Sequence, residues 1–316
     1  MKGKALTRRQ AMCGATVAVA APMVLGVTAP LFAAPRQTQA TIVFEPHIPS
    51  ALRRALNFAG PKGFVASMPQ LMHARAKASY ENIIWNTWFT ANSEESVVKT
   101  PKGHTVVVAV HGGGIFSNPE RFEMSYHASL EHDNGEGLTG QTAAKITSKE
   151  ARDILEGRLP NGDQISMYSY SDFRNGIDVL PMRYGVVIDF DLARKSKRGY
   201  ESFDALAEDP NMIIRAGGTE QNVAYLEKFR RRHGTQLMGN WHPYNRIDPD
   251  QPQTRVPFLA GNRGGVESEG KNQGLGWGYD AEYGMGGDAS MVGMGRYIAV
   301  APKSEFIGVD KLDFVI

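Results

Sequence analysis

Two apolar runs in the chain predict central β-strands. Residues 105–111 read TVVVAVH after the turn signal TPKGH, and residues 184–191 read YGVVIDFD. Short runs of β-branched residues bounded by turn residues are typical of strands that are buried on both faces. Shorter apolar runs predict an edge strand at 41–44 and further strands at 211–218, 297–301 and 305–309. These strands are enough for a mixed sheet.

Helical periodicity appears between the strands. Apolar residues recur at helical spacing over 50–58 and 68–89, and the sequence SNPE at 117–120 begins a helix that should run to residue 132. Further helices are predicted at 148–157 and for about fifteen residues from Thr219. From 239 to 295 the chain is rich in glycine and proline, which predicts long loops. The pattern indicates an α/β fold: a mixed sheet with flanking helices and long Gly/Pro-rich C-terminal loops.

The first 33 residues have the pattern of an export signal. Basic residues precede a stretch of small and apolar residues, and we expect cleavage after residue 33 or 34. Thr7-Arg8-Arg9 resembles the twin-arginine export motif, which implies a protein that folds before export, often around a cofactor; ordinary secretion is the alternative. Pro22 and Pro30 argue against stable insertion in a membrane. We therefore expect a periplasmic or secreted protein with a single α/β domain over 34–316, including a loop-rich subregion at 239–295.

Charge and cysteine content narrow the classes of function. Removal of residues 1–33 takes away four basic side chains and no acidic ones, so the formal net charge changes from +2 to −2. This balance does not favour nucleic acid as a partner. Because Cys13 is the only cysteine, the mature chain has no thiol for a nucleophile, a zinc site or a disulfide.

A histidine and three glycines, His111 and Gly112 to Gly114, follow the first central strand. Glycines before a helix expose backbone N–H groups at the favourable end of the helix dipole, which suits a carboxylate, a phosphate or an oxyanion. The stretch resembles the HGGG oxyanion motif of lipase-type α/β-hydrolases. That family's G-x-S-x-G nucleophile motif does not follow, and Ser290 has the wrong spacing for it. A structural turn with a buried histidine is the alternative interpretation.

The helix after this turn carries candidate metal ligands. Glu123, His127 and Glu131 are spaced four residues apart and share one helix face. His132 and Glu136 extend this polar face into the following loop. Imidazole and carboxylate groups at this density predict a divalent metal site, with zinc as the expected ion. The alternative is an ordinary solvated helix face.

Aromatic residues mark a possible binding loop later in the chain. Trp241, His242 and Tyr244 lie together in a proline-containing segment, and Trp277 lies in a second glycine-rich segment. Aromatic faces of this kind suit a sugar or another ring in a binding cleft. Loops that pack only their own aromatic side chains are the alternative.

A second resemblance rests on four charged residues. Asp189 and Asp191 at the end of a strand, Lys271 and Asp288 follow the order of the motifs of haloacid-dehalogenase-type phosphatases. That resemblance implies an aspartyl nucleophile with bound magnesium. The second acid of the last motif is missing, because Val292 stands in its place.

The leading hypothesis is a metal-dependent hydrolase acting on a small-molecule, carbohydrate or acidic substrate. Its catalytic residues would be His111 and a general base, Glu131 or Glu136, and its oxyanion would bind the amides of Gly112 to Gly114. The candidate metal ligands are His111, His127, His132 and His242. A periplasmic ligand-binding protein without catalysis would use the same amides with Trp241, Tyr244 and Trp277. A lyase acting on acidic sugars and the phosphatase are further alternatives, and the sequence does not determine the oligomeric state.

Overall fold

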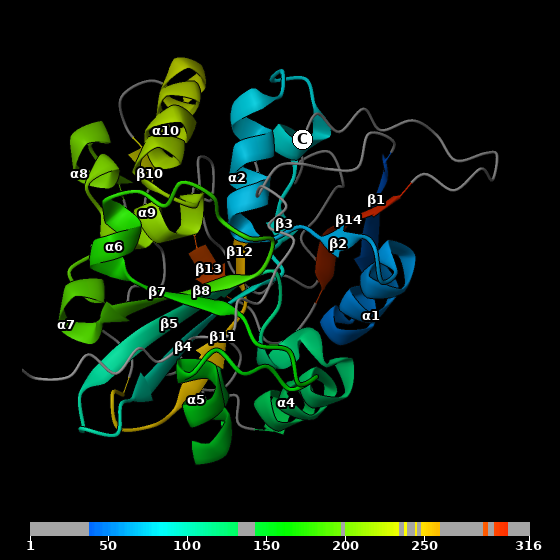
Figure 1. Ribbon diagram of the computed structural model, residues 1–316. Coiled ribbons are helices and arrows are strands. Elements are labelled where there is room, and N and C mark those ends of the chain that lie inside the picture. The colour runs from blue at the N-terminus through cyan, green and yellow to red at the C-terminus, as the bar shows by residue number, and fades with distance from the viewer. Residues whose placement is uncertain are drawn as a thin grey trace, which may run out of the picture.

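The largest feature of the computed structural model is a six-stranded mixed sheet with the order β6-β11-β4-β5-β8-β7 (Figure 1). The structure describes residues 38–131, 143–196, 200–233, 237–238, 244, 248–259, 287–289 and 294–302. Neighbouring strands of the sheet are antiparallel except β7 and β8, which are parallel. The strands are β4 (Ser93–Lys99), β5 (Thr105–His111), β6 (Ala144–Lys145), β7 (Ser166–Ser169), β8 (Tyr184–Asp189) and β11 (Gln253–Arg255).

Three smaller sheets complete the β-structure. One has the order β1-β14-β2, another β13-β12-β3, and the last pairs β10 with β9. Their strands are β1 (Thr38–Glu45), β2 (Phe64–Val65), β3 (Phe89–Thr90), β9 (Tyr200–Glu201), β10 (Leu237–Met238), β12 (Pro257–Leu259), β13 (Gly287–Ala289) and β14 (Gly295–Pro302). The edge strand predicted at 41–44 and the strand predicted at 297–301 are confirmed, and they pair with each other.

Helices cover both faces of the six-stranded sheet (Figure 1). Buried residues of α1, α4 and α5 belong to one core, and those of α6, α7 and α9 belong to the other. A third core joins α2, α3 and α10 to β14. The helices are α1 (Ile48–Ala59), α2 (Met68–Lys77), α3 (Ile83–Asn86), the 3₁₀ turn η1 (Ile115–Ser117), α4 (Pro119–Glu131), α5 (Ser148–Leu155), α6 (Tyr170–Arg174), α7 (Phe190–Ala193), α8 (Phe203–Ala207), α9 (Pro210–Ala216) and α10 (Thr219–His233).

The position of β5 explains its uninterrupted apolar sequence. Val106, Val108 and Val110 point into the core with α1, α4 and α5, whereas Val107 and Ala109 point into the opposite core. Successive side chains of a strand face opposite sides of the sheet. When both faces are covered, both sets of positions are buried, and the strand is apolar at successive residues. The predicted fold class, an α/β fold with a mixed sheet and flanking helices, is confirmed.

The strand predicted at 211–218 is wrong, because this segment forms α9. The Asp209 carboxylate caps the helix by accepting hydrogen bonds from the N–H groups of Asn211 and Met212. Pro210 occupies the first turn, and Gly217 ends the helix in the left-handed conformation with a φ of 91°. The apolar run is too short for its periodicity to separate a buried helix from a strand.

Other boundaries also differ from the sequence prediction. The helix predicted over 68–89 divides into α2 and α3 and is followed by β3. Strands β4 and β7 were not predicted, and β11, β12 and β13 lie within the predicted loop region 239–295. The predicted leader and the strand predicted at 305–309 lie outside the described residues. None of the helices in the described ranges is both long enough and apolar enough to span a bilayer.

Candidate functional site

The HGGG turn directly follows β5 and folds back over the start of β4. Gly112 and Gly113 have positive φ values of 87° and 102°. Their N–H groups both donate to the backbone carbonyl of Asn92, over 2.9 and 3.0 Å. A residue with a side chain adopts this backbone only with strain, so the first two glycines serve the shape of the turn.

The next three backbone amides bind the carboxylate of a side chain of the same protein, Glu94. The N–H groups of Gly114, Ile115 and Phe116 donate to the two carboxylate oxygens of Glu94 over 3.1, 2.8 and 2.7 Å. Burial raises the pKa of Glu94 to about 7, against the effect of these three donors. An external anion would reach these amides only by displacing Glu94.

His111 is enclosed and uses both ring nitrogens inside the protein. Its Nδ1 lies 2.9 Å from the Ser93 hydroxyl, and its Nε2 lies 3.1 Å from the carbonyl oxygen of Ile214. The carbonyl can only accept, so Nε2 carries the proton and the hydroxyl donates to Nδ1. Burial lowers the pKa of His111 to about 4, which keeps the ring neutral. In this arrangement His111 positions β4, β5 and α9 and presents no free nitrogen to a metal or a substrate.

The predicted helix face on α4 contacts a histidine from another part of the chain. One oxygen of Glu123 lies 3.1 Å from Nε2 of His127 and 3.1 Å from Nε2 of His47. The other ring nitrogen of His47 lies 2.8 Å from the Ser50 hydroxyl. Within the residues that the structure describes, no set of three or more His, Cys, Asp or Glu side chains is arranged to hold a metal ion.

The remaining predicted metal and catalytic residues are not all described. His132, Glu136 and His242 lie outside the described residues, as do Trp241 and Trp277, and so does the side chain of Glu131. Their roles stay predictions. The described residues give no support to the phosphatase alternative. The Asp189 carboxylate caps α7 by accepting a hydrogen bond from the N–H of Leu192, and Asp191 forms an ion pair with Arg194 on the surface.

Tyr244 is buried, and its hydroxyl donates to Glu95 over 2.5 Å. The same carboxylate accepts from Arg215 through Nε (2.6 Å) and Nη2 (2.9 Å), and from Arg255 through Nε (2.8 Å) and Nη2 (2.6 Å). The two guanidinium groups hold the pKa of Glu95 well below its usual range, although burial acts in the opposite direction. The predicted ligand-binding tyrosine is thus part of an internal ionic cluster in the described structure.

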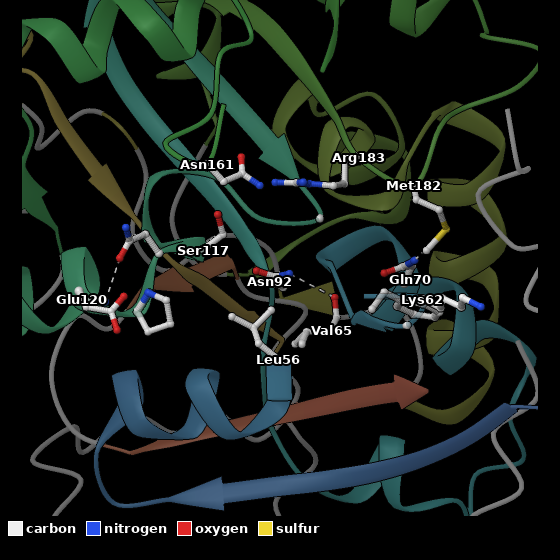
Figure 2. A pocket seen from close by; sticks show the side chains of 15 residues that line it. Leu56, Lys62, Val65, Gln70, Asn92, Ser117, Glu120, Asn161, Met182 and Arg183 are labelled. Carbon is white, nitrogen blue, oxygen red and sulfur yellow. Dashed lines mark hydrogen bonds between the residues drawn. The ribbon is translucent and has the colours of Figure 1, made fainter. Parts of the chain in front are cut away.

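A cleft of ≈ 580 Å³ lies beside the HGGG turn (Figure 2). Its walls come from the end of α1, the β2 segment, the first turn of α2, the HGGG turn and the start of α4. The residues that line it are Leu56, Lys62, Gly63, Phe64, Val65, Gln70, Asn92, Gly112, Ser117, Asn118, Pro119, Glu120, Asn161, Met182 and Arg183. Gly112 is therefore the point at which the sequence-predicted turn meets the cleft.

Gly112 lets the segment around Arg183 pack closely against the turn. A Cβ at position 112 would lie 2.6 Å from the carbonyl oxygen of Met182 and 2.8 Å from Cγ of Arg183. Arg183 forms an ion pair with Asp163, and its buried Nε has no hydrogen-bond partner among the described residues. The turn thus sets the position of one wall of the cleft.

Two buried amide side chains line the cleft, and the NH₂ group of each makes a long hydrogen bond within the protein. Gln70 directs its oxygen to the N–H and hydroxyl of Ser67, and its NH₂ group donates to the Met182 sulfur over 3.7 Å. The NH₂ group of Asn92 donates to the Val65 carbonyl over 3.4 Å, which is long for a hydrogen bond. Both amides can therefore donate more strongly to a ligand than they do to the protein.

No sequence motif marks Lys62, Gln70, Asn92 or Arg183. They lie in four separate segments, and no spacing along the chain connects them. The one available signal was Gly112. A glycine in a turn can allow another segment to pack closely against it, and that segment can then form the wall of a cleft.

Comparison with known proteins identifies the fold. No family model and no curated protein matches the chain. One solved structure, from Nanoarchaeota, is similar over 84% of this chain and 98% of its own, with a TM-score of 0.57 and 24% sequence identity. It is described as accommodating massive sequence variation by the C-type lectin fold. At this identity the likeness shows the fold alone, so the mixed α/β architecture is C-type lectin-like.

Proposed function

We propose that this C-type lectin-like chain is a binding protein whose small polar ligand occupies the cleft beside the HGGG turn. The observation that carries the proposal is the pair of buried amides in the cleft lining, Gln70 and Asn92, whose NH₂ groups make long hydrogen bonds, at 3.7 Å to a sulfur and at 3.4 Å to a carbonyl oxygen. Buried donors are normally well satisfied, so a ligand that supplies good acceptors gains hydrogen bonds here at little cost.

The apolar part of the lining supports the same proposal. Leu56, Phe64 and Val65 give the cleft an apolar wall, and polar groups of Ser117 and Asn161 lie elsewhere around it (Figure 2). A mostly preformed cleft with a few placed polar groups is typical of small-molecule sites. The related structure's fold is said to accommodate massive sequence variation, which is compatible with a scaffold that keeps its core while its binding residues change.

A blocking experiment tests the proposal. In the full chain with Cys13→Ser, the variant Asn161→Cys has a single thiol at the cleft, and a bulky maleimide attached there should obstruct it. Ligand-observed NMR with a panel of monosaccharides, sugar acids and small carboxylic acids measures binding. Lys102→Cys, in the turn before β5 and at the opposite end of that strand, is the matched control. Binding that survives the label at 161 as fully as the label at 102 would place the ligand elsewhere.

A metal-dependent hydrolase remains the second candidate. Its support is the sequence pattern of imidazoles and carboxylates over 123–136, because the described side chains, including Glu123 with His47 and His127, form no metal-binding set. The roles predicted for His132, His242, Glu131 and Glu136 belong to this candidate. Elemental analysis of the exported protein separates the two functions, because the hydrolase requires a stoichiometric divalent metal and the binding protein does not. A periplasmic or secreted location is proposed for either, on the leader sequence.

A further inference from the structure

We infer that the ligand of the cleft presents a carboxylate to Lys62, Gln70 and Asn92. The inference rests on the proposed binding function and adds the chemical class of the ligand. It starts from the positions of the three residues. Lys62 lies in the turn before β2, Gln70 lies in the first turn of α2 just after β2, and Asn92 reaches the carbonyl of Val65 in β2 itself. Three donors therefore surround one short strand.

Among the described residues that line the cleft, one cation has no ion-pair partner. Arg183 pairs with Asp163, and Glu120 lies 3.6 Å from Arg53. Lys62 forms no ion pair with any residue in the described ranges. The local balance is therefore one positive charge. Figure 2 shows Lys62 and Gln70 toward one end of the cleft and Glu120 toward the other.

The orientation of Gln70 is fixed by its neighbours. The backbone N–H of Ser67 can only donate, so the Gln70 atom 2.8 Å away must be the amide oxygen. The NH₂ group must then point the other way, where its partner among the described residues is the weakly accepting sulfur of Met182. Gln70 is 6% exposed, so its NH₂ group has no access to bulk water comparable to that of a surface residue. It is an oriented donor at the cleft wall.

Asn92 is oriented by the same reasoning. Its NH₂ group faces the carbonyl oxygen of Val65, which can only accept. Two oriented N–H donors and one ammonium group are the complement of a carboxylate, which accepts several hydrogen bonds and carries one negative charge. A phosphate monoester carries nearly two negative charges at neutral pH and would leave one of them uncompensated.

Matched acids and amides test the inference. Calorimetric titrations compare three acids with a single carboxylate, glucuronate, lactate and butyrate, with their amides, and glycerol phosphate is a further compound. We expect at least one acid to bind at least tenfold more tightly than its amide and more tightly than glycerol phosphate. A raised salt concentration should lower the affinity for the acid and leave the affinity for the amide unchanged, because the ammonium group of Lys62 is exposed to solvent and is screened by salt.

Two variants identify the residues. Gln70→Glu keeps the oxygen that caps α2 and replaces the NH₂ donor by a negatively charged oxygen, so the acid should lose at least tenfold in affinity. Lys62→Met removes the positive charge and retains the apolar part of the side chain, and it should lower the affinity for the acid by a similar factor. Lys102→Met, at the far end of β5, should change nothing. Thermal unfolding of each variant checks that the fold is intact.

The outcomes separate this inference from the proposed function. Equal affinity for acid and amide, or an acid whose affinity is unchanged by Gln70→Glu and Lys62→Met, overturns the carboxylate site while cleft binding stands. Tighter binding of glycerol phosphate than of every acid overturns it in favour of a phosphate. Binding of no compound in either the panel or the matched pairs overturns both proposals.

Discussion

The carboxylate carbon of Glu94 lies only 2.8 Å from the point where a Cβ on residue 114 would be. Gly114 does not adopt the left-handed conformation, and the close approach of the Glu94 carboxylate leaves no room for a side chain here. We expect Gly114→Ala to displace Glu94 from its three amide donors and to lower the free energy of unfolding by about 2–3 kcal/mol, because overpacking adds to lost hydrogen bonds. Urea denaturation measures this.

The control is Gly162→Ala. Gly162 has a φ of 87° and open space around its Cα, so the substitution tests backbone strain without a clash. Its cost should be about 1 kcal/mol. A Gly114→Ala variant as stable as the wild type would show that Glu94 is not held as closely as the structure indicates.

The Glu94 carboxyl should make stability depend on pH. Its pKa is raised from 4.5 to about 7 in the folded protein, so the folded state holds the proton more tightly than the unfolded chain. The stability this provides is complete below pH 4.5 and is lost as the pH rises through 7. Glu94→Gln removes this titration. We therefore expect the variant to gain about 3 kcal/mol relative to the wild type between pH 4.5 and pH 8.

The measurement is a series of urea unfolding curves over that pH range. Only the change in the difference between the two proteins matters, because any constant cost of fitting an amide against three N–H donors cancels. Glu156→Gln, at an exposed position after α5, serves as the comparison. A difference that stays constant with pH would mean that the Glu94 carboxyl is ionised throughout.

The central part of the fold was predictable because its signals are local. The run at 105–111 and the cap at 118–120 specify β5 and α4 without reference to any distant residue. Strand β4 was missed because SEESVVK contains two acids, and acids in a strand normally indicate a solvated face. In the structure both are buried, Glu94 by backbone amides and Glu95 by two arginines. The partners that permit this burial come from distant segments.

The candidate site was only partly predictable for the same reason. The sequence indicated that the amides of Gly112 to Gly114 bind an anion. In the structure the Gly114 amide binds the carboxylate of Glu94 together with the amides of Ile115 and Phe116, whereas those of Gly112 and Gly113 donate to the Asn92 carbonyl. The sequence offered no reason to connect Lys62 or Gln70 with Gly112, since each lies in a different segment that the sheets bring together. Tyr244 was selected for its loop and its aromatic ring, but its contact with Glu95 depends on a strand that the sequence analysis did not identify.

The ionic cluster around Glu95 should be essential for stability. Glu95→Gln removes the negative charge that the buried guanidinium groups of Arg215 and Arg255 share. Removing one partner of a buried ion pair typically costs 3–5 kcal/mol, so we expect a loss of about 4 kcal/mol or failure to fold. Lys99→Ala, which breaks the exposed pair with Asp250, should cost less than about 1 kcal/mol. Similar losses in the two variants would contradict the burial of the cluster.

The imidazole of His111 should remain neutral between pH 5 and pH 8. Its folded pKa of about 4 lies below the ordinary 6.5, so the stability it provides is complete above pH 6.5 and is lost as the pH falls through 4. NMR of the imidazole carbon-bound protons should show no titration of His111 between pH 5 and pH 8. A midpoint near 7 would instead fit the general base of the hydrolase hypothesis. Ser93→Ala provides the structural test: it removes the donor to Nδ1 and the acceptor of the Met68 N–H, and should cost about 1–3 kcal/mol of unfolding free energy.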